Sequence, residues 1–265
     1  MIEMDTINII KIGGNVIDDE IQLSSFLKDF SDLEGHKILI HGGGKLATEL
    51  AKKLNIPQKM VEGRRVTDAQ TLEVATMVYA GLINKKIVAK LQSFGCNASG
   101  FSGADGNLIK SKKREIKDVD YGFVGDILEN GIDTQKFSQF FENGITPVIC
   151  SITHDGMGSL LNTNADAIAS EIAKALSCYF EVSLSYCFEK MGVLKDVHDE
   201  NSLIPILYKD QYLELKEKKI IFEGMIPKID YAFLALENGV NEVHICHAKN
   251  ITTLHKNGLK TSLKK

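Results

Sequence analysis

The stretch Ile7-Asn8-Ile9-Ile10-Lys11-Ile12-Gly13-Gly14 predicts a short strand that ends beside a lysine and two glycines. A run rich in isoleucine is typical of a strand buried on both faces, as in a parallel sheet. Comparable runs recur along the chain, separated by segments with helical periodicity, and the strand candidates are 7–12, 37–41, 147–150, 182–187 and 242–246. The alternation predicts repeated β-α units around a mostly parallel sheet, an α/β fold.

Two further segments depart from this simple alternation. Residues 107–127 mix charges with two glycines around short apolar stretches, which predicts an antiparallel hairpin or flap. The longest helical pattern starts after Thr67, a candidate N-cap with Asp68 in the first turn, and continues to Ser93, where Gly95 follows. Its apolar surface is wider than a helix on a sheet needs, which indicates either a subunit interface or deep burial.

Composition narrows the class of protein. A chain of 265 residues that is 44% hydrophobic can form one large α/β unit or two lobes that share a sheet. The net charge of -4 offers no broad basic field for nucleic acid, so small molecules are the expected partners.

The expected location is the cytoplasm. The five cysteines are odd in number and form no Cys-x-x-Cys pair, which argues against a disulfide framework or zinc knuckle and fits a reducing compartment. The N-terminus lacks the basic and apolar regions of a signal peptide. No apolar run approaches the roughly 18 residues of a membrane span, so no membrane association is expected.

Two glycine-rich segments follow predicted strands, where α/β folds bind ligands. Beside Lys11, Gly13 and Gly14 would let phosphate oxygens approach backbone N–H groups, although a tight turn with a surface lysine fits equally well. The second segment, 41–45, places three glycines at a helix start and predicts an anion-binding nest.

The second segment also supports a rival function. It is not a Walker A loop, because Leu46 stands where Ser or Thr is required. Gly42, Gly44 and Ala47 nevertheless fit a loose Gly-x-Gly-x-x-Ala pattern, with Glu62 roughly twenty residues later. The alternative is therefore a nicotinamide-dependent dehydrogenase.

Three other segments carry candidate binding groups. Arg64 and Arg65 precede the long helix and could grip a carboxylate, although ion-paired surface arginines are more common. Residues 162–166, Asn-Thr-Asn-Ala-Asp, offer more polar groups at a helix start than one N-cap needs. Lys228 follows Pro227 at the start of a helix, and its local spacing alone indicates only a solvent-facing residue.

Taken together and in order, these segments resemble the amino acid kinase family over nearly the whole chain, with Gly192-Val193-Leu194 as a further match. The resemblance implies a three-layer αβα sandwich with a mostly parallel central sheet and two lobes. Residues 1–177 would bind an N-acylated glutamate and carry the dimer interface, and residues 178–265 would bind the nucleotide. The implied reaction is ATP-dependent phosphorylation of the side-chain carboxylate, with Mg²⁺ held mainly through the nucleotide phosphates.

The resemblance also implies residue roles. Lys11 and Lys228 look like the two lysines that neutralise charge on the transferring phosphoryl group, and Asp166 is similar to the aspartate that positions both. Gly14 and Gly43 would offer N–H groups to phosphoryl oxygens. The implied acyl-glutamate contacts are Gly43, Gly44, Arg65 and Asn162. The implied nucleotide contacts are Lys11, Gly13, Gly14, Glu189, Gly192, Leu194 and Lys228.

The implied chemistry needs no general base, because a γ-carboxylate with a pKa near about 4.3 is ionised at neutral pH. His41 and His154 are accordingly expected to be structural. Where the family usually has Thr/Ser-Asp-Val-x-Gly-Val-Leu, this chain departs with residues 188–194, Phe-Glu-Lys-Met-Gly-Val-Leu. Glu189 keeps the charge of the aspartate on a longer arm.

Several alternatives stay open at this point. The acyl group could be acetyl or a larger one such as succinyl. Glutamate 5-kinase, carbamate kinase and uridylate kinase would keep the lysine and glycines but lack the Gly-Arg-Arg and Asn-Thr-Asn-Ala-Asp pairing. A scaffold without activity is disfavoured, since every matched catalytic position is intact. We expect a homodimer joined through the helix predicted over 67–93.

Overall fold

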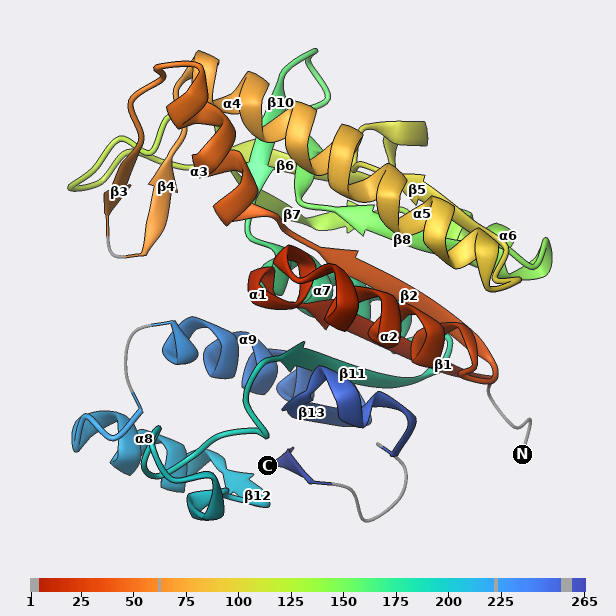
Figure 1. The fold of residues 1–265 in the computed structure, drawn as a ribbon, viewed down its shortest axis with the longest axis vertical. Coiled ribbons are helices and arrows are strands. Elements are labelled where there is room, and N and C mark those ends of the chain that lie inside the picture. Colours follow the sequence, from red (N-terminus) through yellow and green to blue (C-terminus); the bar gives the residue numbers. More distant parts are fainter. Residues whose placement is uncertain (1–4, 62, 222–223, 254–258) are drawn as a thin grey trace. The chain divides into compact units, whose positions relative to one another are not determined.

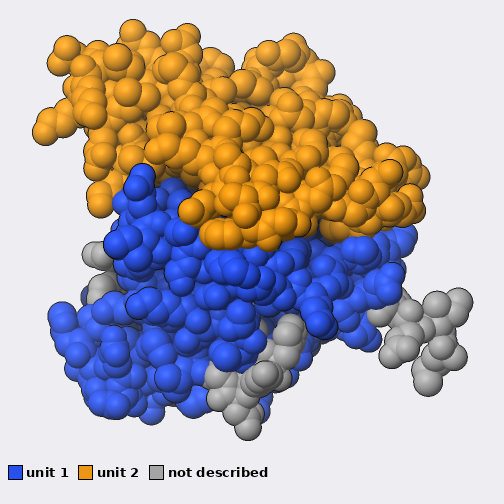
Figure 2. Space-filling view, turned by 45° about the vertical axis from the view of Figure 1, so that its right-hand side comes forward, with its two compact units in different colours: residues 1–38, 169–265 blue, residues 39–168 orange. Residues whose placement is uncertain are grey.

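The computed structural model describes residues 5–61, 63–221, 224–253 and 259–265, which form two compact units. Unit 1 comprises 1–38 and 169–265, and unit 2 comprises 39–168 (Figure 2). These bounds differ from the lobes 1–177 and 178–265 expected from sequence, because the N-terminal strand pairs with a strand beyond residue 180. The predicted lobes divide the chain by the ligand that each part binds, whereas the units divide it by internal contacts. The predicted lobes therefore stay a proposal about function.

Unit 1 has a five-stranded arrangement in the order β12, β14, β13, β11, β1 (Figure 1). The strands are β1 (Thr6–Ile12), β11 (Glu181–Phe188), β12 (Ile206–Tyr208), β13 (Glu242–His247) and β14 (Lys260–Lys264). Only the β13–β14 pair is antiparallel, and the other neighbours run parallel. Both β1 and β11 are buried along almost their whole length, which explains the isoleucine-rich sequence of β1, while β11 also buries Ser183 and Ser185.

The helices of unit 1 come from both ends of the chain. They are α1 (Gly14–Asp18), α2 (Glu20–Ser31), α8 (Lys209–Glu217) and α9 (Met225–Glu237), with short 3₁₀ segments η3 (Glu200–Ser202) and η4 (Ala248–Thr253). Helix α9 packs against β13 and β14, and α8 packs against β12. The unit boundary falls within β2 (His36–His41) and α7 (Ala165–Leu176).

Unit 2 contains three groups of strands. Strand β8 (Thr146–Cys150) pairs in parallel with β2 and with β5 (Ala98–Phe101). A second group consists of β6 (Ile109–Lys113), β7 (Val124–Ile132), β9 (Ile152–His154) and β10 (Leu160–Thr163). A third is the hairpin of β3 (Lys59–Val61) and β4 (Arg64–Val66). Since β6 and β7 run antiparallel, the hairpin predicted over 107–127 is confirmed.

The long helical run of unit 2 has three parts: α4 (Ala69–Thr76), the π-helical segment η1 (Met77–Ile83) and α5 (Asn84–Ser93). Its α5 part packs against β5 and β8 (Figure 1). The predicted N-cap was wrong by one residue: the Asp68 carboxylate, not Thr67, accepts a hydrogen bond from the Thr71 N–H at 2.8 Å. Helices α3 (Gly44–Lys53) and α6 (Thr134–Glu142) and the 3₁₀ turn η2 (Asp105–Asn107) complete the unit.

The predicted α/β class is confirmed, and a strand occupies each of the five predicted positions. All five cysteines are free. Across the described residues, no helix combines the length and the apolar character needed to cross a bilayer.

Candidate active site

A cavity of about 460 Å³ opens in unit 1 at the carboxyl ends of β1 and β11. Its lining includes seven residues expected from sequence to contact the nucleotide: Lys11, Gly13, Gly14, Glu189, Gly192, Leu194 and Lys228. The Gly13 N–H donates to the Cys187 carbonyl at 2.8 Å, which extends the strand pairing as far as the glycines. A Cβ atom at Gly14 would meet nothing within 4 Å, so the backbone there is open to a ligand.

Lys11 and Lys228 approach the same part of β11 from distant parts of the sequence. Lys11 is the register partner of Tyr186 and is only 9% exposed. The Lys228 Nζ atom, carried by the first turns of α9, lies 5.6 Å from the ring centroid of Tyr186 and 5.7 Å from that of Phe188. The aromatic faces attract the ammonium. Lys11 and Lys228 therefore line one cavity, which local spacing around Lys228 did not predict; Lys190 also belongs to its lining.

The loop that departs from the family pattern is held by the last strand. Gly192 has φ +159°, and a Cβ atom there would lie 2.6 Å from Thr261 Oγ1 and 2.7 Å from Leu203 Cδ1. The Val193 N–H donates to Thr261 Oγ1 at 2.8 Å, and that hydroxyl donates to the Ile204 carbonyl at 2.7 Å. Thr261 is fully buried, and sequence reasoning missed it because nothing near residue 261 indicates its partners.

Gly192→Ala is expected to raise KM for ATP at least about tenfold, because the added methyl group must displace the loop from Thr261. Initial rates at varied ATP concentration check this. Gly144→Ala is the matched control, since Gly144 also has a positive φ but lies in unit 2 with open space around it. An unchanged KM for ATP in Gly192→Ala would separate this loop from nucleotide binding.

In unit 2, Arg65 joins the second glycine-rich segment. Its Nη2 donates to the Gly44 carbonyl at 2.8 Å and to Thr48 Oγ1 at 2.7 Å, and its Nη1 donates to Gln58 Oε1. Gly43 has φ +156°, which only glycine adopts readily, and it starts α3. The guanidinium is thus fixed beside the glycine N–H groups, a cationic arrangement suited to a carboxylate. Glu62, part of the dehydrogenase alternative, lies outside the described residues.

Asn162 is brought to the same region by Thr67. The Asn162 Nδ2 donates to Thr67 Oγ1 at 3.0 Å, and the Asn162 N–H donates to the Phe123 carbonyl at 2.9 Å. The Thr67 N–H donates to the Tyr121 carbonyl at 2.9 Å, and the Thr67 carbonyl accepts from the Phe123 N–H at 2.7 Å. Thr67 is therefore buried by tertiary contacts, which explains why Asp68 rather than Thr67 caps the helix.

Asp166 lies in the first turn of α7, where Asn164 is the cap. The Asn164 Oδ1 accepts hydrogen bonds from the N–H groups of Asp166 at 2.7 Å and Ala167 at 3.1 Å. Asn164 alone therefore caps the helix, and the side chains of Asn162 and Asp166 are not needed for capping, as the sequence indicated. Asp166 belongs to unit 2 and the two lysines to unit 1, so its positioning role stays a prediction.

His41 has a structural role, because both of its ring nitrogens form hydrogen bonds inside the protein. Asn84 Nδ2 lies 3.1 Å from Nε2, and since the Asn84 amide nitrogen can only donate, Nε2 accepts and Nδ1 donates to the Gly42 carbonyl at 2.9 Å. Asn84 also donates to the Val148 carbonyl at 3.0 Å. Burial is the main reason why the pKa of His41 falls to about 4; the hydrogen bond to the Gly42 carbonyl opposes the fall, and the nearby Lys85 charge adds to it. The imidazole is therefore neutral and links β2 to α5.

This neutral histidine makes stability depend on pH. Because the pKa is about 6.5 in the unfolded chain and about 4 in the folded one, its contribution is complete above about pH 6.5 and is lost as pH falls toward 4. We expect His41 to remove ~2 kcal/mol of stability between pH 6.5 and 5. Urea unfolding at both pH values measures this. The same pH slope in wild type and His41→Gln would contradict it.

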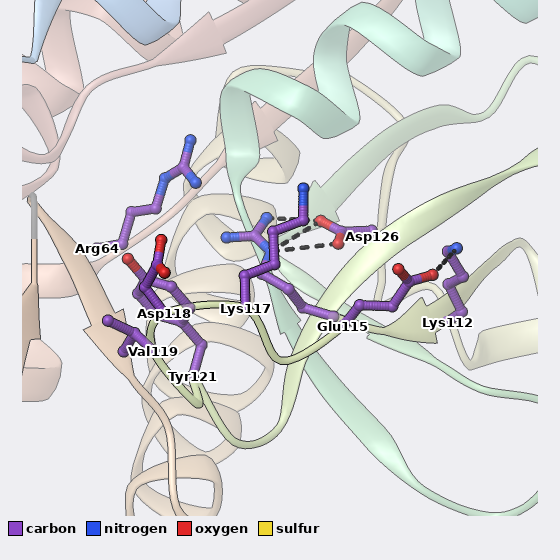
Figure 3. A pocket seen from close by; sticks show the side chains of 9 residues that line it. Arg64, Lys112, Glu115, Lys117, Asp118, Val119, Tyr121 and Asp126 are labelled. Atoms are coloured by element: carbon purple, nitrogen blue, oxygen red, sulfur yellow. Dashed lines mark hydrogen bonds and ion pairs between the residues drawn. The ribbon is translucent and has the colours of Figure 1, made fainter.

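A second cavity, of about 450 Å³, is lined by Arg64 but not by Arg65. Arg64 lines it together with residues of the β6–β7 connection, among them Lys117 and Tyr121 (Figure 3). Arg114 is held there by Asp126 at 2.5 Å, so it is part of an ion pair. The two adjacent arginines of the Gly-Arg-Arg segment thus have different surroundings, and only Arg65 contacts Gly44.

Comparisons with known proteins identify the family. The family model described as "Amino acid kinase family" matches residues 6–247. An acetylglutamate kinase of Cytophaga hutchinsonii is 53% identical over 252 residues, covering 95% of each chain, and one of Phocaeicola vulgatus is 51% identical, covering 93% of this chain and 95% of the relative. The solved structure of smu.665 from Streptococcus mutans superimposes with a TM-score of 0.80 at 26% identity, covering 96% of this chain and 98% of that one. The chain therefore belongs to the amino acid kinase family.

Proposed function

We propose that this protein is an acetylglutamate kinase. It transfers the γ-phosphoryl group of ATP to the side-chain carboxylate of N-acetyl-L-glutamate and forms the acyl phosphate, a step of arginine biosynthesis. The curated relatives that are more than half identical over nearly the full length carry this name, which supports the substrate.

The single observation that carries the mechanism is the convergence of Lys11 and Lys228 on one cavity. Both ammonium-bearing side chains accompany the open backbone of Gly14 at the ends of buried strands, while the Gly13 N–H is already bonded to the Cys187 carbonyl. Compact positive charges beside accessible N–H groups are what a transferring phosphoryl group requires. The dehydrogenase alternative gives neither lysine a role.

The reaction needs charge compensation more than proton transfer. The substrate carboxylate is ionised at neutral pH, so it attacks without a general base. Attack brings two anions together, and the lysines offset their repulsion while N–H groups hold the phosphoryl oxygens in line. The neutral, fully hydrogen-bonded His41 is consistent with a site that uses no catalytic histidine.

Mg²⁺ fits the residues of the unit 1 cavity. Its lining contains one carboxylate, that of Glu189, together with three lysines, Lys11, Lys190 and Lys228. Mg²⁺ usually binds through one or two carboxylates and substrate phosphates. When bound, the ion would neutralise phosphate charge, and Glu189 would hold it directly or through water.

The acyl-glutamate would bind to unit 2 through the N–H groups of Gly43 and Gly44, the guanidinium of Arg65 and the amide of Asn162. The observed bond between Arg65 and the Gly44 carbonyl supports this grouping. N-succinyl-L-glutamate is the second candidate substrate, since these groups would contact the glutamate part that both substrates share.

Homodimer formation through the α4–η1–α5 run is part of the proposal, as is a cytoplasmic location. Met77 and Leu82 support the dimer, because these apolar side chains of η1 are 52% and 47% exposed. Apolar surface of this kind on one helical run is typical of a subunit interface.

A hydroxamate assay tests the function. The protein is incubated with ATP, Mg²⁺ and hydroxylamine, together with N-acetyl-, N-succinyl- or free L-glutamate. Hydroxylamine traps an acyl phosphate, so we expect hydroxamate with N-acetyl-L-glutamate and none with free glutamate. Absence of hydroxamate from a folded, ATP-binding protein with every acyl-glutamate would refute the proposal.

A further inference from the structure

Tyr79 lies in the π-helical segment η1, next to the candidate substrate residues of unit 2. The Asn84 N–H donates to the Tyr79 carbonyl five residues earlier, which is the π-helical pattern. Such segments occur often at functional sites. Tyr79 is only 4% exposed, and the proposed mechanism gives it no role.

The Tyr79 ring runs along the two glycines that start α3. A Cβ atom built on Gly43 would lie 3.0 Å from the ring Cδ1 and 3.2 Å from Cε1. One built on Gly44 would lie 3.9 Å from the hydroxyl oxygen. The hydroxyl therefore points to the side of Gly44, where Arg65 is bound to the Gly44 carbonyl.

The Tyr79 hydroxyl can donate its proton to a ligand, because Arg65 cannot accept it. Burial raises the pKa of Tyr79, and the charge of the nearby Arg65 guanidinium opposes that rise. A guanidinium can only donate, so Arg65 offers no acceptor for the proton of the Tyr79 hydroxyl. No residue in the described part of the chain accepts a hydrogen bond from the Tyr79 hydroxyl. Because buried tyrosine hydroxyls usually find a partner, a ligand oxygen is the expected acceptor.

We propose that Tyr79 is a substrate-binding residue whose hydroxyl donates to an oxygen of the acyl-glutamate, a carbonyl or carboxylate oxygen held beside Arg65. The inference rests on the proposed function and adds to it a contact that fixes the substrate's orientation. The ring packs under Gly43 and Gly44, so the same side chain also supports the N–H groups of that segment.

Tyr79→Phe tests the contact, because it removes only the hydroxyl and keeps the ring against Gly43. In the hydroxamate assay we expect KM for the acyl-glutamate to rise about fivefold to tenfold, with kcat within about twofold and KM for ATP unchanged. Tyr121→Phe is the matched control, since Tyr121 lines the cavity around Arg64 and should leave all three constants unchanged.

The outcomes separate this inference from the proposed function. An active wild type with an unchanged KM in Tyr79→Phe overturns the inference alone, as does an equal change of both KM values with a lower melting temperature. If wild type forms no hydroxamate, the proposed function fails. Calorimetric titration of N-acetyl-L-glutamate then decides: weaker binding to Tyr79→Phe supports the contact, and equal or no binding refutes it.

Discussion

Lys11→Ala and Lys228→Ala are each expected to lower kcat by about 10³-fold, the loss typical when one preorganised group that stabilises transition-state charge is removed. Both side chains line the cavity of unit 1, and Lys228 lies over the rings of Tyr186 and Phe188. The charge they neutralise grows as the carboxylate meets the phosphoryl group, so kcat should fall more than substrate affinity. Steady-state rates of acyl phosphate formation measure this effect.

Lys218→Ala is the control for both variants. Lys218 belongs to the same unit, contacts Glu214 at 3.5 Å and does not line the cavity. Its removal should leave kcat unchanged. Circular dichroism of the variants establishes that they are folded. Full turnover in a folded Lys11→Ala or Lys228→Ala variant would remove that lysine from the mechanism.

Arg65→Ala is expected to raise KM for the acyl-glutamate about 10- to 100-fold, as expected for a charge-assisted hydrogen bond to a carboxylate. The guanidinium is fixed by Gly44, Thr48 and Gln58, so little conformational entropy is lost when a substrate binds. The KM for ATP should stay unchanged, since Arg65 lies in unit 2 and the nucleotide residues lie in unit 1. Kinetics with each substrate varied in turn give both constants.

Arg64→Ala is a closely matched control, because it removes the adjacent guanidinium of the same strand. Arg64 lines the cavity of Figure 3 and does not contact Gly44. We expect its KM for the acyl-glutamate to stay within about twofold of wild type, the size of an ordinary surface substitution. Equal effects in the two variants, or an effect of Arg65→Ala confined to ATP, would contradict the role of Arg65.

The buried parallel strands could be predicted because their environment determines their composition. Strand β1 is buried on both faces, so isoleucine fills four of its seven positions without strict alternation. Strand β11 is buried almost throughout as well, although Ser183 and Ser185 interrupt its apolar residues. The β6–β7 hairpin was predictable for the opposite reason, since charged residues and glycines interrupt it.

The helix start near residue 67 shows where local patterns fail. Thr67 and Asp68 are both good N-caps by type, and tertiary contacts decide between them. Asn162 and the backbone of Tyr121 and Phe123 form hydrogen bonds with Thr67, which leaves Asp68 to cap the helix. Neither partner is near in sequence, so no window around residue 67 could identify the cap.

The π-helical segment and the Thr261 contact were likewise beyond prediction. The π-helical turn depends on packing of Tyr79 and Ile83 around Gly43, which the sequence brings together only in the folded chain. Thr261 binds a loop 68 residues earlier. Lys228 could be assigned only through family resemblance, because its role depends on β11 rather than on its own helix.

The most direct test of the account follows the phosphoryl group itself. Wild-type protein is mixed with N-acetyl-L-glutamate, Mg²⁺ and ATP carrying ³²P in the γ position, and hydroxylamine is added after a single turnover. We expect the label to move to the amino acid, and hydroxylamine then to release it while one hydroxamate forms for each ADP. ADP formation with the label only in free phosphate, and no hydroxamate, would contradict phosphorylation of the carboxylate.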